Sequence, residues 1–352
     1  MLPAILVDPS ALWLAHAGDT VESAENAITR ALQWMKPNAI GPLQLYLSSR
    51  GVEALTDVNA FPAEPRFAEI LKLLGLESVL NARTLAASVS RFLSTTPWIE
   101  DTVGLRDVAF QAIRVSPDLT MEISDAQLRK LSLETFGVAA ICASEDKRHS
   151  LYAFPRQNMP HGSALVETKV GIMEVGAAHV RMEESVDRRI EVLGDPSVWP
   201  AALCPHETWR NAENPEEFEL AIWLAAKTMS DKSGIGLKEF RVGTRFIECL
   251  RENSAAGKGP YAGSVLGKCA QTVLLQSSLE PKPFYVSAEA KAAIRQRARD
   301  RAKAWRLHVT KGHQALRLMY WELPDKQIEF ATLGVKGEES IHDGDELPPR
   351  RW

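Results

Sequence analysis

AILVD, at residues 4–8, is a run of four apolar residues that ends in an acid. This pattern is typical of a buried strand that carries Asp8 at its carboxyl end. An amphipathic helix is expected over residues 20–35, with Thr20 as its N-cap, and residues 43–48 alternate like a second strand. The order strand, helix, strand predicts an α/β layer with a mainly parallel sheet.

Further elements extend this pattern to about residue 155. Residues 66–76 and 81–96 have helical spacing, and Gly75 is expected to close the first of these helices. The apolar run FGVAAICAS at residues 136–144 predicts a strand, which is expected to pair with SLYAFP at residues 150–155. We therefore expect an α/β domain over residues 1–155.

Residues 156–352 have a different sequence pattern, which predicts an α+β domain with antiparallel strands. Short runs at strand period occupy residues 163–175, 178–184 and 188–194. Helices are expected over residues 214–231, 240–253 and 262–276, and Asn214 followed by Pro215 marks the first of these starts. A hairpin with the turn PDK is expected over residues 315–335.

A basic helix is expected over residues 291–306, directly before this hairpin. Ile294, Ala298, Ala302 and Trp305 are spaced to form one apolar face, and basic residues crowd the remaining circumference. Residues 291–317 contain nine Lys and Arg but one acid, a net charge of +8, whereas the whole chain carries −4, so the remainder carries −12.

This separation of charge predicts a negatively charged partner. Arginine suits bidentate contact with phosphate, so we expect DNA or RNA to bind here. The alternative is a solvated surface whose cations pair with the acidic remainder of the chain. The residues expected to contact nucleic acid are Arg295, Arg299, Lys303, Arg306, Lys311 and Arg317.

The composition is that of a globular protein, with 45% apolar and 24% charged residues, and 352 residues favour two domains. No apolar run reaches the roughly 18 residues of a membrane helix, so no membrane partner is expected. The four cysteines are scattered without a CxxC pair, which favours reduced thiols and a cytoplasmic location. GSVLGKC at residues 263–269 lacks the earlier glycine and the hydroxyl of a phosphate-binding loop, and neither a nucleotide nor a flavin is implied.

ILVDPSALW at residues 5–13 resembles the first strand of PIN-like nucleases. The resemblance implies that Asp8 joins other carboxylates in holding Mg²⁺ or Mn²⁺, which activates water for phosphodiester cleavage. Later acids that follow in approximate order are Glu53 or Asp57, then Asp101 or Asp107. The implied catalytic set is Asp8, Asp57, Asp101 and Asp107, with Asp8 as a metal ligand. An aspartate that caps a turn in an inactive α/β domain is the alternative.

HQALRLMYWELPDKQIEFATLGVKGEE at residues 313–339 resembles the core of RelE-type RNA-cleaving toxins. In that family a helix packs on an antiparallel sheet, an Arg lies on a strand, and a basic residue follows the last strand. Arg317, Lys336 and His313 match this pattern. Such basic groups would orient and neutralise a phosphate.

These observations predict a nucleic-acid-binding protein, either a metal-dependent nuclease or a toxin-like effector of a bacterial defence system. The alternative is a non-catalytic subunit that holds nucleic acid or an acidic protein partner within a larger defence assembly. A small-molecule enzyme built on the α/β sheet is the third hypothesis.

Overall fold

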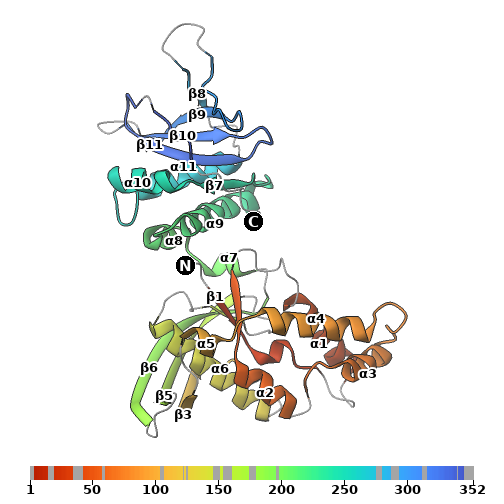
Figure 1. The fold of residues 1–352 in the computed structure, drawn as a ribbon. Coiled ribbons are helices and arrows are strands. Elements are labelled where there is room, and N and C mark those ends of the chain that lie inside the picture. The colour runs from red at the N-terminus through yellow and green to blue at the C-terminus, as the bar shows by residue number, and fades with distance from the viewer. Residues whose placement is uncertain are drawn as a thin grey trace. The chain divides into compact units, whose positions relative to one another are not determined.

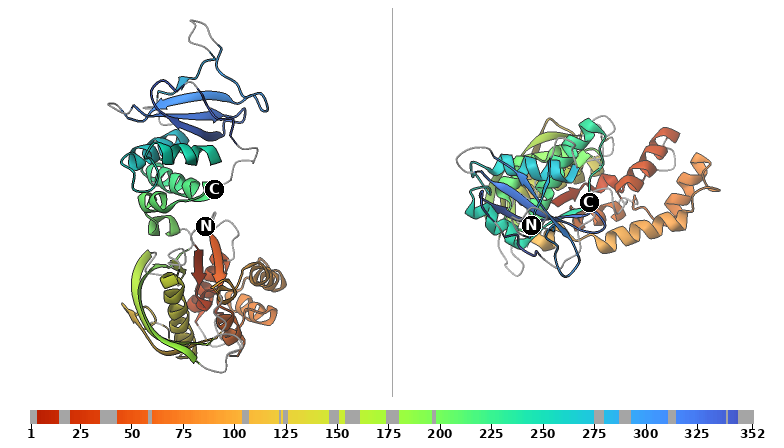
Figure 2. Two further views of the ribbon diagram at one scale, coloured as in Figure 1. Left: turned by 60° about the vertical axis from the view of Figure 1, so that its left-hand side comes forward. Right: turned by 90° about the horizontal axis from the view of Figure 1, so that it is seen from above.

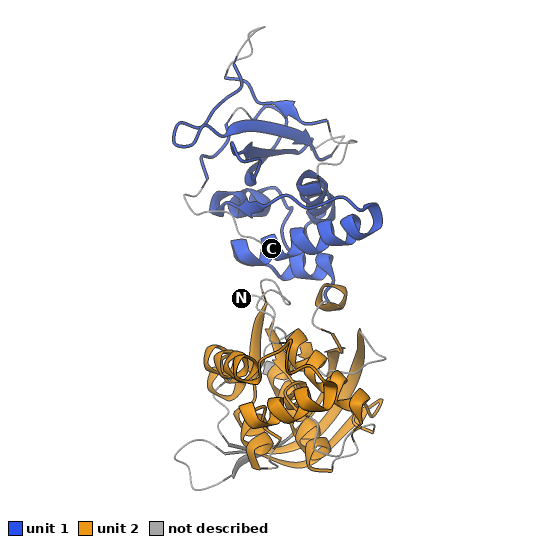
Figure 3. Ribbon diagram, turned by 90° about the vertical axis from the view of Figure 1, so that its right-hand side faces the viewer, with its two compact units in different colours: residues 1, 203–352 blue, residues 2–202 orange. Residues whose placement is uncertain are grey.

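The computed structural model describes residues 4–14, 20–34, 43–57, 60–103, 107–121, 123, 126–145, 151–153, 161–173, 180–195, 198–274, 280–286, 293–310, 315–338 and 340–344. The chain divides into two compact units, one of residues 2–202 and one of residues 203–352 (Figure 3). The expected boundary at residue 155 falls inside the first unit. Two long strands that follow residue 155 complete the first sheet, so the division comes later.

The first unit contains a six-stranded sheet in the order β2-β1-β4-β6-β5-β3. Strands β2, β1, β4 and β6 are mutually parallel, whereas β5 pairs antiparallel with both β6 and β3. The strands span Ala4–Val7 (β1), Gln44–Leu47 (β2), Asp107–Ser116 (β3), Leu151–Ala153 (β4), His161–Met173 (β5) and Val180–Leu193 (β6). The two runs expected at residues 178–184 and 188–194 are therefore one strand.

Helices of this unit follow the start and stop signals of the sequence. Thr20 accepts a hydrogen bond from the Ser23 N–H before α1, and Gly75 ends α3 in the left-handed conformation. The helices span Pro9–Ala11 (η1), Val21–Trp34 (α1), Ser49–Asp57 (α2), Glu64–Leu74 (α3), Ala82–Thr95 (α4), Ile99–Val103 (α5), Ala126–Glu145 (α6) and Trp199–Ala202 (α7).

The predicted strand at residues 136–144 is wrong, because these residues belong to α6. Phe136, Val138, Ile141 and Cys142 are all buried against sheet residues such as Val166. A helix buried on several sides has the same continuous apolar run as a buried strand, so periodicity could not separate them. Consequently β4 pairs in parallel with β1 and β6 instead of forming a hairpin with that segment.

The second unit contains a five-stranded sheet in the order β7-β11-β10-β9-β8. Its pairs are antiparallel except β7 with β11, which is parallel. The elements span Pro205–Asn211 (α8), Pro215–Ser233 (α9), Phe240–Val242 (β7), Thr244–Glu252 (α10), Ala262–Leu274 (α11), Lys282–Pro283 (β8), Lys303–His308 (β9), Arg317–Glu322 (β10) and Ile328–Gly334 (β11). Asn214 caps α9 as expected, with Pro215 in the first turn. The helix expected from residue 240 begins only at Thr244, after β7.

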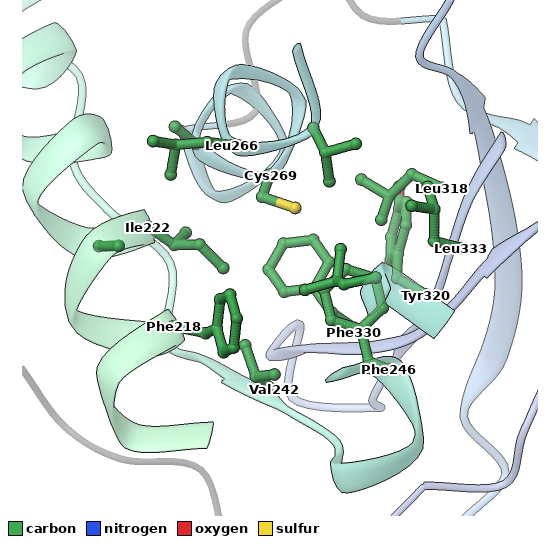
Figure 4. Packing of buried hydrophobic residues seen from close by; sticks show 14 of the residues in the cluster. Phe218, Ile222, Val242, Phe246, Leu266, Cys269, Leu318, Tyr320, Phe330 and Leu333 are labelled. Carbon is green, nitrogen blue, oxygen red and sulfur yellow. The ribbon is translucent and has the colours of Figure 1, made fainter. Parts of the chain in front are cut away.

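Helices α9, α10 and α11 lie on one side of this sheet, as Figures 1 and 2 show. The core between them is filled by Phe218, Phe246, Cys269, Leu318 and Phe330 among other side chains (Figure 4). The rings of Phe246 and Phe330 stack with their centroids 5.8 Å apart. In the described ranges, no helix lies on the opposite side of the sheet, here called the outer face (Figure 1).

The expected basic helix over residues 291–306 is wrong in the part that the structure describes. Residues 293–302 form bridges and a tight turn, in which the Arg297 N–H donates to the Ala302 carbonyl at 2.9 Å and Arg301 has a φ of 60°. Residues 303–308 form β9. Trp305 and Leu307 pack into the core on the inner side of the sheet while Ala304 lies on the outer side, which is a period of two.

The four cysteines carry free thiols, as expected, and Cys204 is the exposed one. Burial raises the pKa of the Cys249 and Cys269 thiols. Within the described ranges, no helix combines the length and the apolar character that crossing a membrane requires.

Candidate nucleic-acid interface

Asp8 lies directly after β1, as the sequence predicts, but its carboxylate does not face an open cleft. The side chain is fully buried. One oxygen accepts hydrogen bonds from the Ser10 N–H at 2.7 Å and the Ser132 hydroxyl at 3.1 Å, and the other accepts from the Tyr152 hydroxyl. Burial raises the pKa of Asp8, and the three hydrogen bonds oppose that shift only in part.

The structure does not bring the other three predicted carboxylates to Asp8. Asp57 is the exposed last residue of α2, and Asp101 is exposed on α5, where it lines an open groove with Trp98. Asp107 starts β3, which is separated from β1 by three strands in the sheet order. Asp107 pairs with Met173, the last residue of β5. The first residue of β5, His161, pairs with Leu193 of β6, and Leu193 pairs in turn with Ala153 of β4. Asp107 therefore lies at the end of β5 that is remote from β4.

Another buried acid of this unit is Glu100, which was not among the predicted residues. Glu100 accepts from the Ser48 hydroxyl at 2.5 Å and from the Ser49 N–H at 3.1 Å, just after β2. Across the described residues, no three His, Cys, Asp or Glu side chains gather as metal ligands would. The described side chains therefore do not fit the Mg²⁺ or Mn²⁺ site that a PIN-like centre implies.

Basic side chains gather instead on the outer face of the second sheet. His308 of β9 pairs with Arg317 of β10, and Arg306 pairs with Met319 on one side and Lys282 of β8 on the other. Cross-strand partners project from the same face of a sheet. Because Met319 belongs to the outer cluster with Ala304 and Trp321, the four basic residues share the outer face. We call Lys282, Arg306, His308 and Arg317 the cationic face.

Three of the four side chains of the cationic face are not paired with an acidic side chain in the described part of the chain. Lys282, Arg306 and Arg317 form no ion pair with an acid among the residues that the structure describes. The Nε atom of Arg317 is buried and has no hydrogen-bond partner in the described part of the chain. Like charges placed opposite one another on neighbouring strands repel, so this arrangement favours an anion that bridges them.

An aromatic ring supports two guanidinium groups beside this face. Phe284 follows β8 and is buried. The Arg295 guanidinium lies 5.2 Å from the centroid of its ring and that of Arg306 lies 5.7 Å from it. Such cation–π contacts hold a guanidinium in place without neutralising its charge.

One basic residue expected at the interface, Arg299, forms ion pairs within the unit instead. Arg297 and Arg299 belong to an ionic hub, which we define as Arg241, Arg297, Arg299, Asp300 and Glu329. Glu329 is fully buried and accepts from Arg241 and, at 2.9 Å, from Arg297. Arg297 also donates to Asp300 at 2.6 Å, and these hydrogen bonds lower the pKa of Asp300.

The C-terminal strap, residues 340–344, closes the hub. Arg299 donates to the Asp343 and Gly344 carbonyls at 3.0 and 3.1 Å, and Trp321 donates through Nε1 to the His342 carbonyl at 2.7 Å. Gly344 has a φ of 74°, and a Cβ there would lie 1.5 Å from Glu329 Oε1. The strap can reach the hub only because residue 344 is a glycine.

The structure places the six residues of the predicted interface in different surroundings. Arg295, Arg306 and Arg317 lie at the cationic face, whereas Arg299 is held in the hub. Lys303 pairs with Glu322 and so projects from the inner face. Lys311 and His313 lie outside the described residues, and Lys336 is exposed shortly after β11. Lys282 and His308 were missed, although the alternation of AWRLH at residues 304–308 could have placed His308 beside Arg306.

Comparison with family models, curated proteins and solved structures finds no match for this chain.

Proposed function

We propose that this protein binds nucleic acid and that the cationic face of its second unit holds the phosphates. The observation that carries the proposal is the placement of Arg306 and Arg317 on adjacent strands of one sheet face, without an acidic partner among the described residues. The two guanidinium groups lie at diagonal cross-strand positions, whose Cα atoms are about 7–8 Å apart. Planar guanidinium groups carried by neighbouring strands on one sheet face suit bidentate contact with phosphate oxygens.

RNA cleavage is a second candidate, favoured by the position of His308 directly opposite Arg317. An imidazole can give or take a proton near neutral pH, and a neighbouring guanidinium can stabilise charge that develops on a phosphate. This pairing supports the resemblance of residues 313–339 to RelE-type toxins, in which a strand arginine faces the substrate phosphate.

Binding is tested by fluorescence anisotropy with a labelled single-stranded RNA and the matching DNA. The double variant Arg306→Gln/Arg317→Gln should lower affinity at least tenfold, because it removes two phosphate contacts. Arg245→Gln is the matched control, since this exposed arginine lies on α10, on the inner side of the sheet. Equal affinities for the wild type, the double variant and the control would refute the proposal.

Cleavage is tested on the same RNA with a label at one end, resolved on a denaturing gel. His308→Gln should remove cleavage while leaving affinity within about threefold, because the imidazole would move a proton and Arg317 would hold the phosphate. An RNA that stays intact with the wild-type protein would remove this second candidate and leave the binding proposal standing.

A further inference from the structure

An open groove lies in the first unit, between the end of α4 and the start of α5. Its volume is about 780 Å³, which is within the range of sites that bind small molecules. Among the described residues that line it, Asp101 is the one that carries a charge, so the lining is negatively charged. The lining residues are Ser90, Leu93, Ser94, Thr95, Thr96, Pro97, Trp98, Asp101 and Thr102.

Most hydroxyl groups of the lining already donate their protons to the backbone. Each of four hydroxyls donates to a carbonyl three or four residues earlier, and the four are those of Ser94, Thr95, Thr96 and Thr102. A hydroxyl has one proton and two acceptor lone pairs. While these bonds are kept, the four oxygens can therefore only accept a further hydrogen bond.

The last turn of α4 adds backbone acceptors to the groove. The final carbonyls of a helix have no intrahelical partner, and Pro97, two residues after α4, has no N–H to donate to them. Because α4 has 14 residues, this end carries a partial negative charge of about half an elementary charge. The start of α5 lies here too, but its first turn carries Glu100 and Asp101, whose charges outweigh the partial positive charge of that short helix.

Trp98 places an aromatic ring beside the carboxylate. It is partly exposed and precedes α5, and its carbonyl accepts the first hydrogen bond of that helix from the Thr102 N–H. Asp101 lies three residues later, so the two side chains share one side of the first turn. The face of an indole ring attracts a cation, and Leu93 and Pro97 provide apolar contacts for a short carbon chain. An anionic ligand would meet acceptors and negative charge instead.

We propose that this groove binds a small organic cation, whose guanidinium or ammonium group lies over the Trp98 ring and donates to the Asp101 carboxylate. A guanidinium group suits these acceptors because it is planar, carries five donors and stacks on aromatic rings. The inference is independent of the nucleic-acid interface, since every residue that lines the groove belongs to the unit of residues 2–202.

The test is a nuclear magnetic resonance titration of the full chain with butylguanidinium and with its neutral isostere butylurea. Butylguanidinium should shift the backbone amide signals of residues 93–102 in a saturable way, and butylurea should bind about tenfold more weakly because it has no charge. Asp101→Asn and Trp98→Leu should each weaken the binding of butylguanidinium about threefold, the first by removing the anion and the second by removing the ring. Asp57→Asn is the matched control, because it removes an exposed carboxylate outside the groove, and it should leave the affinity unchanged.

Equal affinities of the wild type for the charged and the neutral compound would overturn the inference, as would the absence of any saturable shift at residues 93–102. Wild-type affinity in Asp101→Asn, or an equal loss in Asp57→Asn, would do the same. Circular dichroism shows whether each variant is folded, and the conservative change at Asp101 keeps the test decisive if Trp98→Leu is not. A Gly-Arg-Gly peptide, blocked at both ends, that binds more than about tenfold more tightly than butylguanidinium would make the groove a docking surface for a protein and overturn the assignment of a small ligand.

Discussion

At the scale of single residues, the carboxylate of Asp8 is a structural centre of the first unit. It joins the end of β1 to β4 through Tyr152, to α6 through Ser132 and to the start of η1 through the Ser10 N–H. The strand that delivers Asp8 was predictable from its apolar run. The partners Ser132 and Tyr152 were not predictable, because they lie more than a hundred positions later and only the folded chain brings them to Asp8.

Replacing Asp8 tests this structural role. Asp8→Ala leaves the Ser132 and Tyr152 hydroxyls and the Ser10 N–H buried without their acceptor, so the free energy of unfolding should fall by roughly 3 kcal/mol or more. Asp8→Asn keeps an acceptor oxygen and should cost less. Chemical denaturation monitored by circular dichroism measures both. Equal stability of the alanine variant and the wild type would contradict the role.

The difference in stability between the wild type and Asp8→Asn should change with pH in a defined direction. Burial raises the folded-state pKa of Asp8 above its ordinary value of 3.8, so the folded state binds the proton more tightly than the unfolded chain. This contribution to stability is fully present below the unfolded pKa and is lost as pH rises through the raised folded pKa. The wild type should therefore lose stability relative to Asp8→Asn as pH increases from about 4 towards neutrality. A constant difference between the two proteins over that range would contradict the assignment.

At the scale of elements, local signals predicted where helices begin and end better than they predicted whether an apolar or charged run forms a helix or a strand. Thr20, Gly75 and Asn214 act as caps where the sequence placed them, because capping depends on a few adjacent residues. The run at residues 303–308 became a strand, although arginine and alanine favour a helix. Burial of Trp305 and Leu307 against α9–α11 outweighs that propensity, which is small for each residue.

The arginines of the ionic hub should contribute unequally to the free energy of unfolding. Arg297→Ala leaves the fully buried Glu329 with less compensation and should lower the free energy of unfolding of the second unit by about 3–5 kcal/mol. Arg299 is 29% exposed and lies 3.8 Å from Glu329, so Arg299→Ala should cost about 1 kcal/mol or less. Urea denaturation of both variants makes the comparison. A larger loss for Arg299→Ala would show that the strap, rather than the buried pair, stabilises this side of the sheet.

At the scale of the whole molecule, each of the two units has its own main hydrophobic core among the described residues, and charge is unevenly distributed along the chain. One core packs sheet β2-β1-β4-β6-β5-β3 against α6, and the other packs sheet β7-β11-β10-β9-β8 against α9–α11. The excess of basic residues near residues 291–317 marks the segment that supplies cations to both the ionic hub and the cationic face. Its geometry was not predictable, because strand pairing separates the cations of the hub from those of the cationic face.

The two cores predict two separable losses of stability. Phe136→Ala and Phe330→Ala each empty a fully buried site and should cost about 3–5 kcal/mol, the first in the unit of residues 2–202 and the second in the unit of residues 203–352. Hydrogen exchange read by mass spectrometry should show increased exchange only in peptides of the unit that carries the change. Increased exchange throughout the chain for either variant would contradict the division.

The salt dependence of binding to single-stranded RNA tests the central claim most directly. If phosphates displace their counterions onto the cationic face, wild-type affinity should fall steeply with salt, by a slope of about 0.7 in log–log form for each phosphate contact. Arg306→Gln/Arg317→Gln should flatten that slope by about 1.4, whereas Arg245→Gln should leave it unchanged. A slope that is the same in the wild type and the double variant, or an affinity that does not depend on salt, would show that this face does not hold nucleic acid.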